Sequence, residues 1–218
     1  MTTTIAFPTD RLANLLLPGP TGQLEVMTTA PEISRNPRTV AVICHPHPLF
    51  GGTLHNKVIY TLARCFNSLG LATVRFNFRG VGLSQGKYDH GNGENNDLLA
   101  VLAWLQESCP EHKIWLAGFS FGAYIAARAA KVWPTEQLIC VAPPIENFPF
   151  KDLPPFPCPW ILVQGDADEI VSPTAVFSWV NSLEHPPEVI KIQGASHFFH
   201  GKLLELRDDL TTALNKMS

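Results

Sequence analysis

The chain has 218 residues, of which 45% are hydrophobic and 16% are charged. This length suits one α/β domain, and we expect residues 1–218 to form a single domain. The 16 Lys and Arg residues against 19 Asp and Glu give a formal net charge of −3, which excludes the basic surface of a nucleic-acid-binding protein. No apolar run approaches the ~18 residues needed to cross a bilayer, so we expect neither a nucleic-acid nor a membrane partner.

The five cysteines include no pair with C-x-x-C spacing. Cys44 and Cys140 lie inside apolar runs, and Cys65 lies on the apolar face of a predicted helix. Such positions are typical of reduced, buried thiols rather than of a metal site or a catalytic cysteine. Because residues 1–22 also lack the pattern of a secretory signal peptide, we expect a cytoplasmic protein.

Two strand-like segments open the chain, at residues 2–7 and 24–29, and the turn-rich segment 17–22 lies between them. We expect them to form an antiparallel edge. From residue 39 onward, strand-like and helix-like patterns alternate. Strands are predicted at 39–44, 71–78, 113–118, 137–141, 160–164 and 188–192, and helices at 54–69, 94–108, 121–131, 173–183 and 202–216. The alternation predicts an α/β fold with a mostly parallel central sheet and helices on both faces, whose site lies at the carboxyl ends of the strands.

The segment Gly118-Phe-Ser-Phe-Gly122 follows a predicted strand and opens a predicted helix. In a nucleophile elbow, the serine sits on a sharp turn between two such elements, and the residues two positions to either side must be small. Gly118 and Gly122 meet that need. We therefore predict that Ser120 is a nucleophile, the alternative being a tight turn with a structural serine.

The segment Gln164-Gly-Asp-Ala-Asp-Glu-Ile-Val171 follows the strand predicted at 160–164. A carboxylate here can reach a histidine at the end of the next strand, and we predict Asp168 for this role. Asp166 is the alternative, although it could instead brace the turn through its own backbone. Glu169 is interpreted as a solvated loop charge.

The segment Gly194-Ala-Ser-His-Phe-Phe-His200 follows the last predicted strand. We predict that His197 is the general base, which takes the proton of Ser120 and later passes it to the leaving group. Asp168 would fix its tautomer and stabilise the imidazolium. His200, near the start of the last predicted helix, is the competing candidate.

The segment His45-Pro-His-Pro-Leu-Phe-Gly-Gly52 follows the strand predicted at 39–44. Acyl transfer needs two N–H donors for the developing oxyanion. The backbone N–H of Phe121 is predicted to be one donor, and this loop should supply the other. Its prolines have no N–H, which leaves His47 or Leu49, and we favour His47.

The histidines of the same loop allow a second interpretation. His45 and His47 are one residue apart, and such a pair can bind zinc. However, a third ligand with matching spacing is missing, so we predict no metal site.

The order of Ser120, Asp168 and His197 along the chain is that of α/β-hydrolases. The chain resembles this superfamily over essentially its whole length, and more closely the small lid-less bacterial serine hydrolases related to dienelactone hydrolases. Dienelactone hydrolases themselves use a cysteine where this chain has Ser120. The resemblance implies an α/β-hydrolase fold without a lid domain and esterase-like activity on small acyl compounds with no cofactor. The closer resemblance is carried by His45-Pro-His-Pro48, Gly51-Gly52, Asn56-Lys57, Asn77-Phe-Arg-Gly80, Gly82, Ser84, Gly86 and Gly118-Phe-Ser-Phe-Gly122.

Two further segments carry open alternatives. Arg79, in the glycine-rich stretch after the second parallel strand, is expected either to pair with Asp97 or Glu94 or to contact a substrate carboxylate. The proline-rich segment 143–159 stands where lid domains are inserted. Its aromatic side chains either wall an acyl pocket or pack over the sheet edge; they are Phe148, Phe150 and Phe156.

Together these features predict a serine hydrolase that cleaves small ester or thioester substrates through an acyl-enzyme at Ser120. The expected partner is a small-molecule acyl substrate. The alternatives are a non-catalytic binding module for a small ligand on the same fold, and peptidase or lyase chemistry on the same three residues. The oligomeric state stays open between monomer and homodimer.

Overall fold

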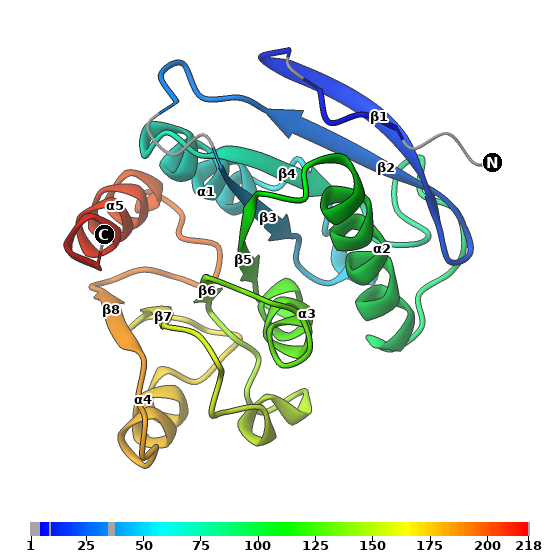
Figure 1. The fold of residues 1–218 in the computed structure, drawn as a ribbon. Helices are drawn as coiled ribbons and strands as arrows, with labels where there is room; N and C mark the ends of the chain where they lie inside the picture. The colour runs from blue at the N-terminus through cyan, green and yellow to red at the C-terminus, as the bar shows by residue number, and fades with distance from the viewer. Residues whose placement is uncertain (1–4, 9, 35–37, 218) are drawn as a thin grey trace.

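The computed structural model describes residues 5–8, 10–34 and 38–217. These residues form one eight-stranded sheet with helices on both of its faces (Figure 1). The strands are β1 (Leu12–Gly19), β2 (Gly22–Thr29), β3 (Thr39–Cys44), β4 (Ala72–Phe76), β5 (Lys113–Phe119), β6 (Gln137–Val141), β7 (Trp160–Gly165) and β8 (Glu188–Ile192). The helices are α1 (Lys57–Ser68), α2 (Asn92–Ser108), α3 (Phe121–Ala130), α4 (Pro173–Asn181) and α5 (Leu203–Met217), with short 3-10 turns η1 (Pro48–Phe50) and η2 (Pro149–Asp152).

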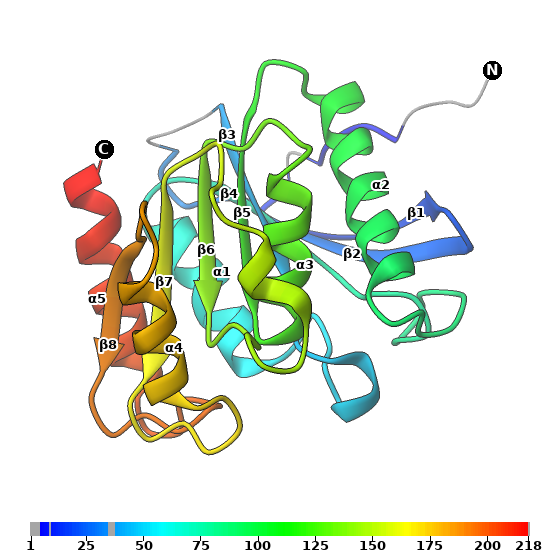
Figure 2. The ribbon, with the colours of Figure 1, turned by 90° about the horizontal axis from the view of Figure 1, so that it is seen from below.

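The strand order is β1-β2-β4-β3-β5-β6-β7-β8, and all pairings from β4 to β8 are parallel. This confirms the predicted α/β-hydrolase fold class with an antiparallel N-terminal edge. In Figure 2 the central strands run towards the bottom of the view, where the loops after β7 and β8 lie. Parallel strands bring their carboxyl ends to one edge, so the loops that follow them meet there.

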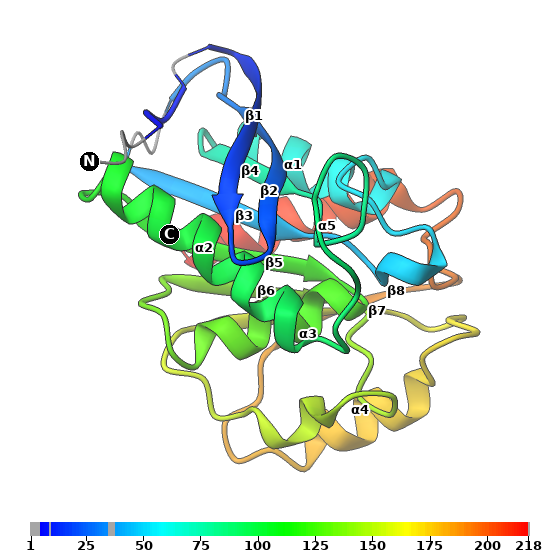
Figure 3. The same cartoon turned by 90° about the vertical axis from the view of Figure 1, so that its right-hand side faces the viewer.

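The first strand differs from the prediction. β1 pairs with β2 from Leu12 opposite Thr29 to Gly19 opposite Gly22, so the segment expected to be a turn is largely strand. Residues 2–4 of the expected strand lie outside the described residues, and residues 5–7 form no strand. They dock on α2 instead, where the Trp104 indole N–H donates to the Ile5 carbonyl at 2.6 Å. Figure 3 shows the resulting β1–β2 hairpin at the edge of the sheet beside α2.

Two apolar layers cover the sheet. α1 and α5 bury one face, and α2, α3 and α4 bury the other. The near-continuous apolar sequences of the parallel strands follow from this, because strands covered on both faces have no solvent side. None of the helices formed by the described residues is long and apolar enough to span a membrane. All five cysteines are without a disulfide, and four of them are buried.

Helix α1 begins three residues later than its apolar pattern predicts. The Asn56 carboxamide oxygen accepts the N–H groups of Val58 and Ile59 at 2.9 and 3.4 Å. An Asn side chain in this position satisfies N–H groups that have no partner within the helix. The cap therefore fixes the start of α1 at Lys57 and leaves residues 45–56 as a loop above the strand ends.

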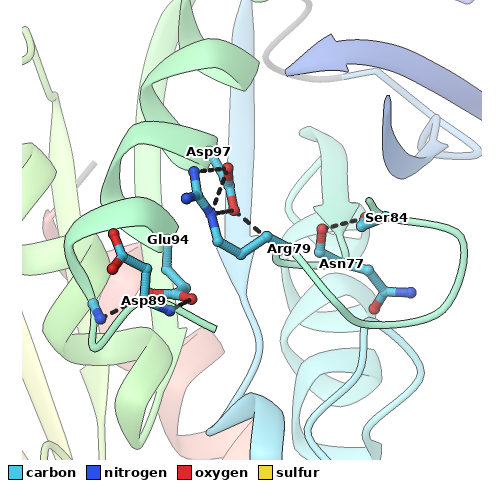
Figure 4. Close-up of polar contacts among 7 residues, drawn as sticks. Asn77, Arg79, Ser84, Asp89, Glu94 and Asp97 are labelled. Carbon is cyan, nitrogen blue, oxygen red and sulfur yellow. Dashed lines mark hydrogen bonds and ion pairs between the residues drawn. The ribbon is translucent and has the colours of Figure 1, made fainter. Parts of the chain in front are cut away.

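The segment between β4 and α2 is held by a buried ion pair (Figure 4). Arg79 donates from its backbone N–H, Nε and Nη2 to the Asp97 carboxylate at 2.7–3.2 Å. The two side chains are 7% and 0% exposed, so Arg79 pairs with Asp97 and points away from solvent. The Glu94 carboxylate has a different task, because it accepts the N–H groups of Asp89 and Gly91 at 2.9 and 2.7 Å.

The Arg79–Asp97 pair gives the first prediction. Asp97→Asn leaves a buried guanidinium without its counter-charge, which costs about 3–5 kcal/mol in comparable sites. We expect urea unfolding to show a loss of that size in the free energy of unfolding. Asp208→Asn is the control, since that carboxylate is exposed and its ion pair among the described residues is with its neighbour Arg207. A loss in Asp97→Asn no larger than in the control would contradict this account.

Candidate active site

Ser120 sits on a sharp turn between β5 and α3, as the elbow sequence predicts. Its backbone has φ 53° and ψ −120°, a conformation that costs a non-glycine residue of order 1–3 kcal/mol. A Cβ on Gly118 would collide with the Gly122 carbonyl, and one on Gly122 would collide with the Cys44 carbonyl. Both positions therefore need glycine, and the tight contact presses the start of α3 against the end of β3.

The three residues selected from the sequence lie in one hydrogen-bonded line. Ser120 Oγ is 3.1 Å from Nε2 of His197, and Nδ1 of His197 is 2.8 Å from Oδ2 of Asp168. His197 and Asp168 are buried, while Ser120 is partly exposed. His200 is exposed, and it is His197 that contacts Ser120.

The Asp168 carboxylate is held by four donors. Besides His197, it accepts the backbone N–H groups of Ile170 and Val171 at 2.9 and 2.8 Å and the Gln164 amide at 2.9 Å. Burial alone would raise the pKa of Asp168, but the bonds from His197, Val171 and Ile170 outweigh it and hold the pKa below its usual value. The carboxylate therefore stays charged and fixes the proton of the imidazole on Nδ1.

The other two acids of this loop join the β7 and β8 loops. Asp166 accepts the Gly194 N–H at 2.6 Å and pairs with Lys191, so it braces the neighbouring loop as well as its own turn, where its carboxylate accepts its own backbone N–H. Glu169 accepts the backbone N–H of His197 at 3.1 Å. Glu169 is exposed, as expected of a solvated loop charge, and it also holds the backbone of His197. Its partner lies 28 residues along the chain, and no local pattern in the sequence indicates such a contact.

His45 has a structural place at the end of β3. Its ring is fully buried, with Nδ1 2.6 Å from the Pro46 carbonyl and Nε2 3.0 Å from the Phe78 N–H. Nδ1 therefore carries the proton, and Nε2 accepts. Both ring nitrogens are engaged, so neither is available to a metal ion. Among the described residues, no three His, Cys, Asp or Glu side chains gather as a metal site requires.

His47 differs from His45 in that its ring faces the site. Nδ1 accepts the Leu49 N–H at 3.2 Å, and Nε2 lies 3.1 Å from the Tyr88 hydroxyl. Burial, and then the nearby His90, lower the pKa of His47. The ring is thus neutral at pH 7, with its proton on Nε2 directed at Tyr88. The Leu49 N–H, one of the two candidate donors of this loop, is already used.

Aromatic rings surround this loop and the start of α3. The His47 ring lies 4.8 Å from Tyr88, 5.1 Å from Phe121 and 6.3 Å from Phe148, measured between ring centroids. Of the three phenylalanines in segment 143–159, Phe148 is the one whose ring contacts His47 and Phe121 among the described residues. Phe150 is buried against Trp179, and Phe156 packs on Trp160. No pattern in the sequence indicates that Tyr88 lies beside this loop.

Comparison with known proteins decides the family. Residues 35–156 match the family model described as serine aminopeptidase, S33. An α/β serine hydrolase homologue from Coxiella burnetii is 52% identical, with 93% of this chain and 97% of that one covered and a TM-score of 0.89. The chain belongs to the α/β serine hydrolases.

Two other solved structures share the fold of this α/β serine hydrolase. XC6422 from Xanthomonas campestris, a member of the group without a lid, is 44% identical, with a TM-score of 0.93 and coverage of 98% of this chain and 97% of that one. Est1E from Butyrivibrio proteoclasticus, solved with ferulic acid bound, is 18% identical, with a TM-score of 0.81 and coverage of 93% and 98%. At that identity, Est1E shares the fold alone.

His45 makes stability depend on pH. Burial, opposed by the bond to Pro46, lowers the pKa of His45 from 6.5 to about 4, so the folded state favours the neutral ring. Its contribution to the free energy of unfolding is full above pH 6.5 and is lost as pH falls towards 4. Between pH 7 and pH 5 we expect the free energy of unfolding of the wild type to fall by about 2 kcal/mol more than that of His45→Gln, measured by urea unfolding.

The exposed His200 provides the control for this measurement. His200→Gln should lose as much stability as wild type between the two pH values, because its ring is solvated in the folded state. Equal losses in wild type and His45→Gln would show that His45 does not set this pH dependence.

Proposed function

We propose that this protein hydrolyses small ester or thioester substrates through an acyl-enzyme at Ser120. The observation that carries the proposal is the line of hydrogen bonds from Ser120 Oγ through His197 to Asp168. Membership of the α/β serine hydrolases supports it. Each of the three side chains follows a different parallel strand, so the line exists only in the folded sheet.

The chemistry starts at the serine hydroxyl. Nε2 of His197 takes the proton as Oγ attacks the substrate carbonyl, and the Asp168 carboxylate stabilises the imidazolium that forms. The tetrahedral intermediate collapses when His197 returns the proton to the leaving alcohol or thiol. Water then enters, gives its proton to His197, and releases the acid and free Ser120.

The developing oxyanion needs two N–H donors, and we assign them to Phe121 and His47. Phe121 is the first residue of α3, so its N–H has no acceptor within the helix and stands at the positive end of the helix dipole. In the loop after β3, the Leu49 N–H is bonded to the His47 ring. His47 is then the loop residue whose backbone N–H can serve, and the neutral ring that engages Leu49 holds the loop in place.

The surroundings of Ser120 favour a small acyl substrate. The segment between β6 and β7 is short, and the lid-less relative XC6422 has the same fold. The rings of His47, Phe121 and Phe148 offer an apolar wall, and Phe50 is largely exposed beside them. We place the acyl group against this wall, in an open site without a cofactor. The thiols without disulfides fit a cytoplasmic setting.

The nucleophile is tested with a fluorophosphonate probe and an ester assay. Ser120→Ala removes the attacking oxygen, so we expect no labelling and a fall in kcat/KM on the order of 10⁴-fold or more. Ser178→Ala, on an exposed position of α4, is the control and should label and turn over as wild type. Full activity in Ser120→Ala would end the acyl-enzyme proposal. A folded wild type that neither labels nor turns over would favour the binding module.

Substrate size gives a separate prediction. Without a lid, nothing shields a long alkyl chain from water, so kcat/KM should be higher for p-nitrophenyl butyrate than for p-nitrophenyl palmitate. An amino-acid p-nitroanilide, added to the panel, measures peptidase action. If the palmitate ester were the better substrate, the open-site argument would be wrong. If the anilide were best, the protein would be a peptidase on the same three residues.

A further inference from the structure

A cavity lies away from Ser120, between helix α1 and the end of the hairpin where β1 begins and β2 ends. Its volume is about 740 Å³, and it is lined from β1, β2, β4, α1 and the residues that follow β2. None of Ser120, Asp168 and His197 lines it. The volume is that of a site for a small organic molecule rather than for a single ion.

The floor of this cavity is Arg75 of β4, which is 4% exposed. Nη1 donates to the Leu54 carbonyl at 3.3 Å, and Nη2 lies 2.9 Å from the Met27 sulfur. Nε is buried with no hydrogen-bond partner. The ion pairs of the described residues include no carboxylate bonded to Arg75.

A buried guanidinium in this state is costly. Arginine stays protonated at neutral pH, and an unpaired buried charge destabilises the fold by several kcal/mol. A sulfur atom, one carbonyl and the face of the Tyr60 ring are weak compensation for five N–H donors. The fork geometry of the guanidinium matches a carboxylate or a phosphate. Arg75 thus has the chemistry of an anion-binding group without its anion.

The charges around the cavity are mostly positive. Arg11 and Arg64 also line it, whereas Glu32 is the one acid among the lining residues. Glu32 pairs with Arg11, and none of the ion pairs among the described residues includes Arg64. Three arginines against one glutamate stand out in a chain of net charge −3. The local field therefore attracts anions.

Part of the rim of the cavity is apolar. Three of the large hydrophobic side chains exposed on the described surface line it, namely Leu12, Ile33 and Tyr60. Cζ of Arg75 lies over the Tyr60 ring at 5.8 Å from its centroid, and both residues line the cavity. An inorganic ion would leave this rim in water. A ligand with an apolar skeleton would cover it.

We propose that this cavity binds a small organic anion, a carboxylate or phosphate carried on an apolar skeleton. The anionic group bonds to the guanidinium of Arg75, with Arg64 beside it, and the skeleton lies against Tyr60, Leu12 and Ile33. The ligand supplies the negative charge that Arg75 lacks among the described residues. This site is independent of the acyl site, because the proposal uses no residue of the Ser120 line.

The test is an NMR titration of amide signals in the Ser120→Ala protein, which cannot turn over ester contaminants. The probes are 3-phenylpropionate and phenyl phosphate, with 3-phenylpropan-1-ol as the uncharged match and inorganic phosphate as the anion without a skeleton. We expect saturable shifts at Tyr60, Arg64 and Arg75. Both aryl anions should bind at least about tenfold more tightly than the alcohol and than phosphate.

Variants separate binding from folding. Arg75→Met fills similar volume without the charge, so it should abolish anion preference while the thermal midpoint is kept or raised. Tyr60→Ala changes an exposed position and should weaken the binding of both aryl anions. It replaces Arg75→Met in the test if that variant does not fold. Arg207→Met, on α5 and outside the cavity, is the matched control and should bind as the parent.

Three results would overturn the proposal. One is no saturable shift at the cavity at probe concentrations up to about 10 mM. Another is shifts confined to the surroundings of residue 120, which would mean that the anions bind as products of the hydrolase site. The third is a lack of the expected selectivity, shown either by equal affinity for the aryl anions and the alcohol or by affinity unchanged in both Arg75→Met and Tyr60→Ala.

Discussion

The contact between the start of α3 and the end of β3 is the constraint on which the site depends. Gly122 lies so close to the Cys44 carbonyl that no side chain fits between them, and Gly118 is equally close to Gly122. This contact forces Ser120 into a positive φ, and the bond from its N–H to the Val141 carbonyl at 2.8 Å holds it there. The same contact sets α3 beside the loop after β3, so one packing event places both Ser120 and the loop.

The parallel sheet then determines what can meet Ser120. Because β7 and β8 end at the same edge, their loops lie side by side, and Asp166 and Glu169 tie them together through the Gly194 and His197 N–H groups. The position of His197 is therefore fixed twice. Its backbone N–H donates to the Glu169 carboxylate, and its ring bonds to the Asp168 carboxylate. A positioned, buried imidazole loses little entropy when it takes a proton, which is what acyl transfer requires.

Local patterns in the sequence predict most of the sheet and select Ser120, Asp168 and His197, which the fold brings into one hydrogen-bonded line, because strand ends and turn residues are local signals. They failed where partners are distant. The hairpin of β1 was misplaced since Leu12–Gly19 contains a proline and a glycine, which an edge strand tolerates and a central strand does not. The tasks of Glu169 and Tyr88, and the use of the Leu49 N–H by His47, depend on tertiary contacts that no spacing along the chain encodes.

Two buried arginines lie in or just after β4, and they differ in how their charge is compensated. Arg75 lies within the strand, and Arg79 follows it. Arg79 has a carboxylate on its fork, with Asp97 receiving four of its bonds, and the pair is complete within the chain. Arg75, four residues earlier, has a carbonyl, a sulfur and an unpartnered Nε. A purely structural arginine would be expected to resemble Arg79, since an apolar residue at the position of Arg75 would fill the space without a desolvated charge. The cavity that opens onto Arg75, and not onto Arg79, accounts for the difference: one charge is completed by the fold, and the other is left for a ligand to complete.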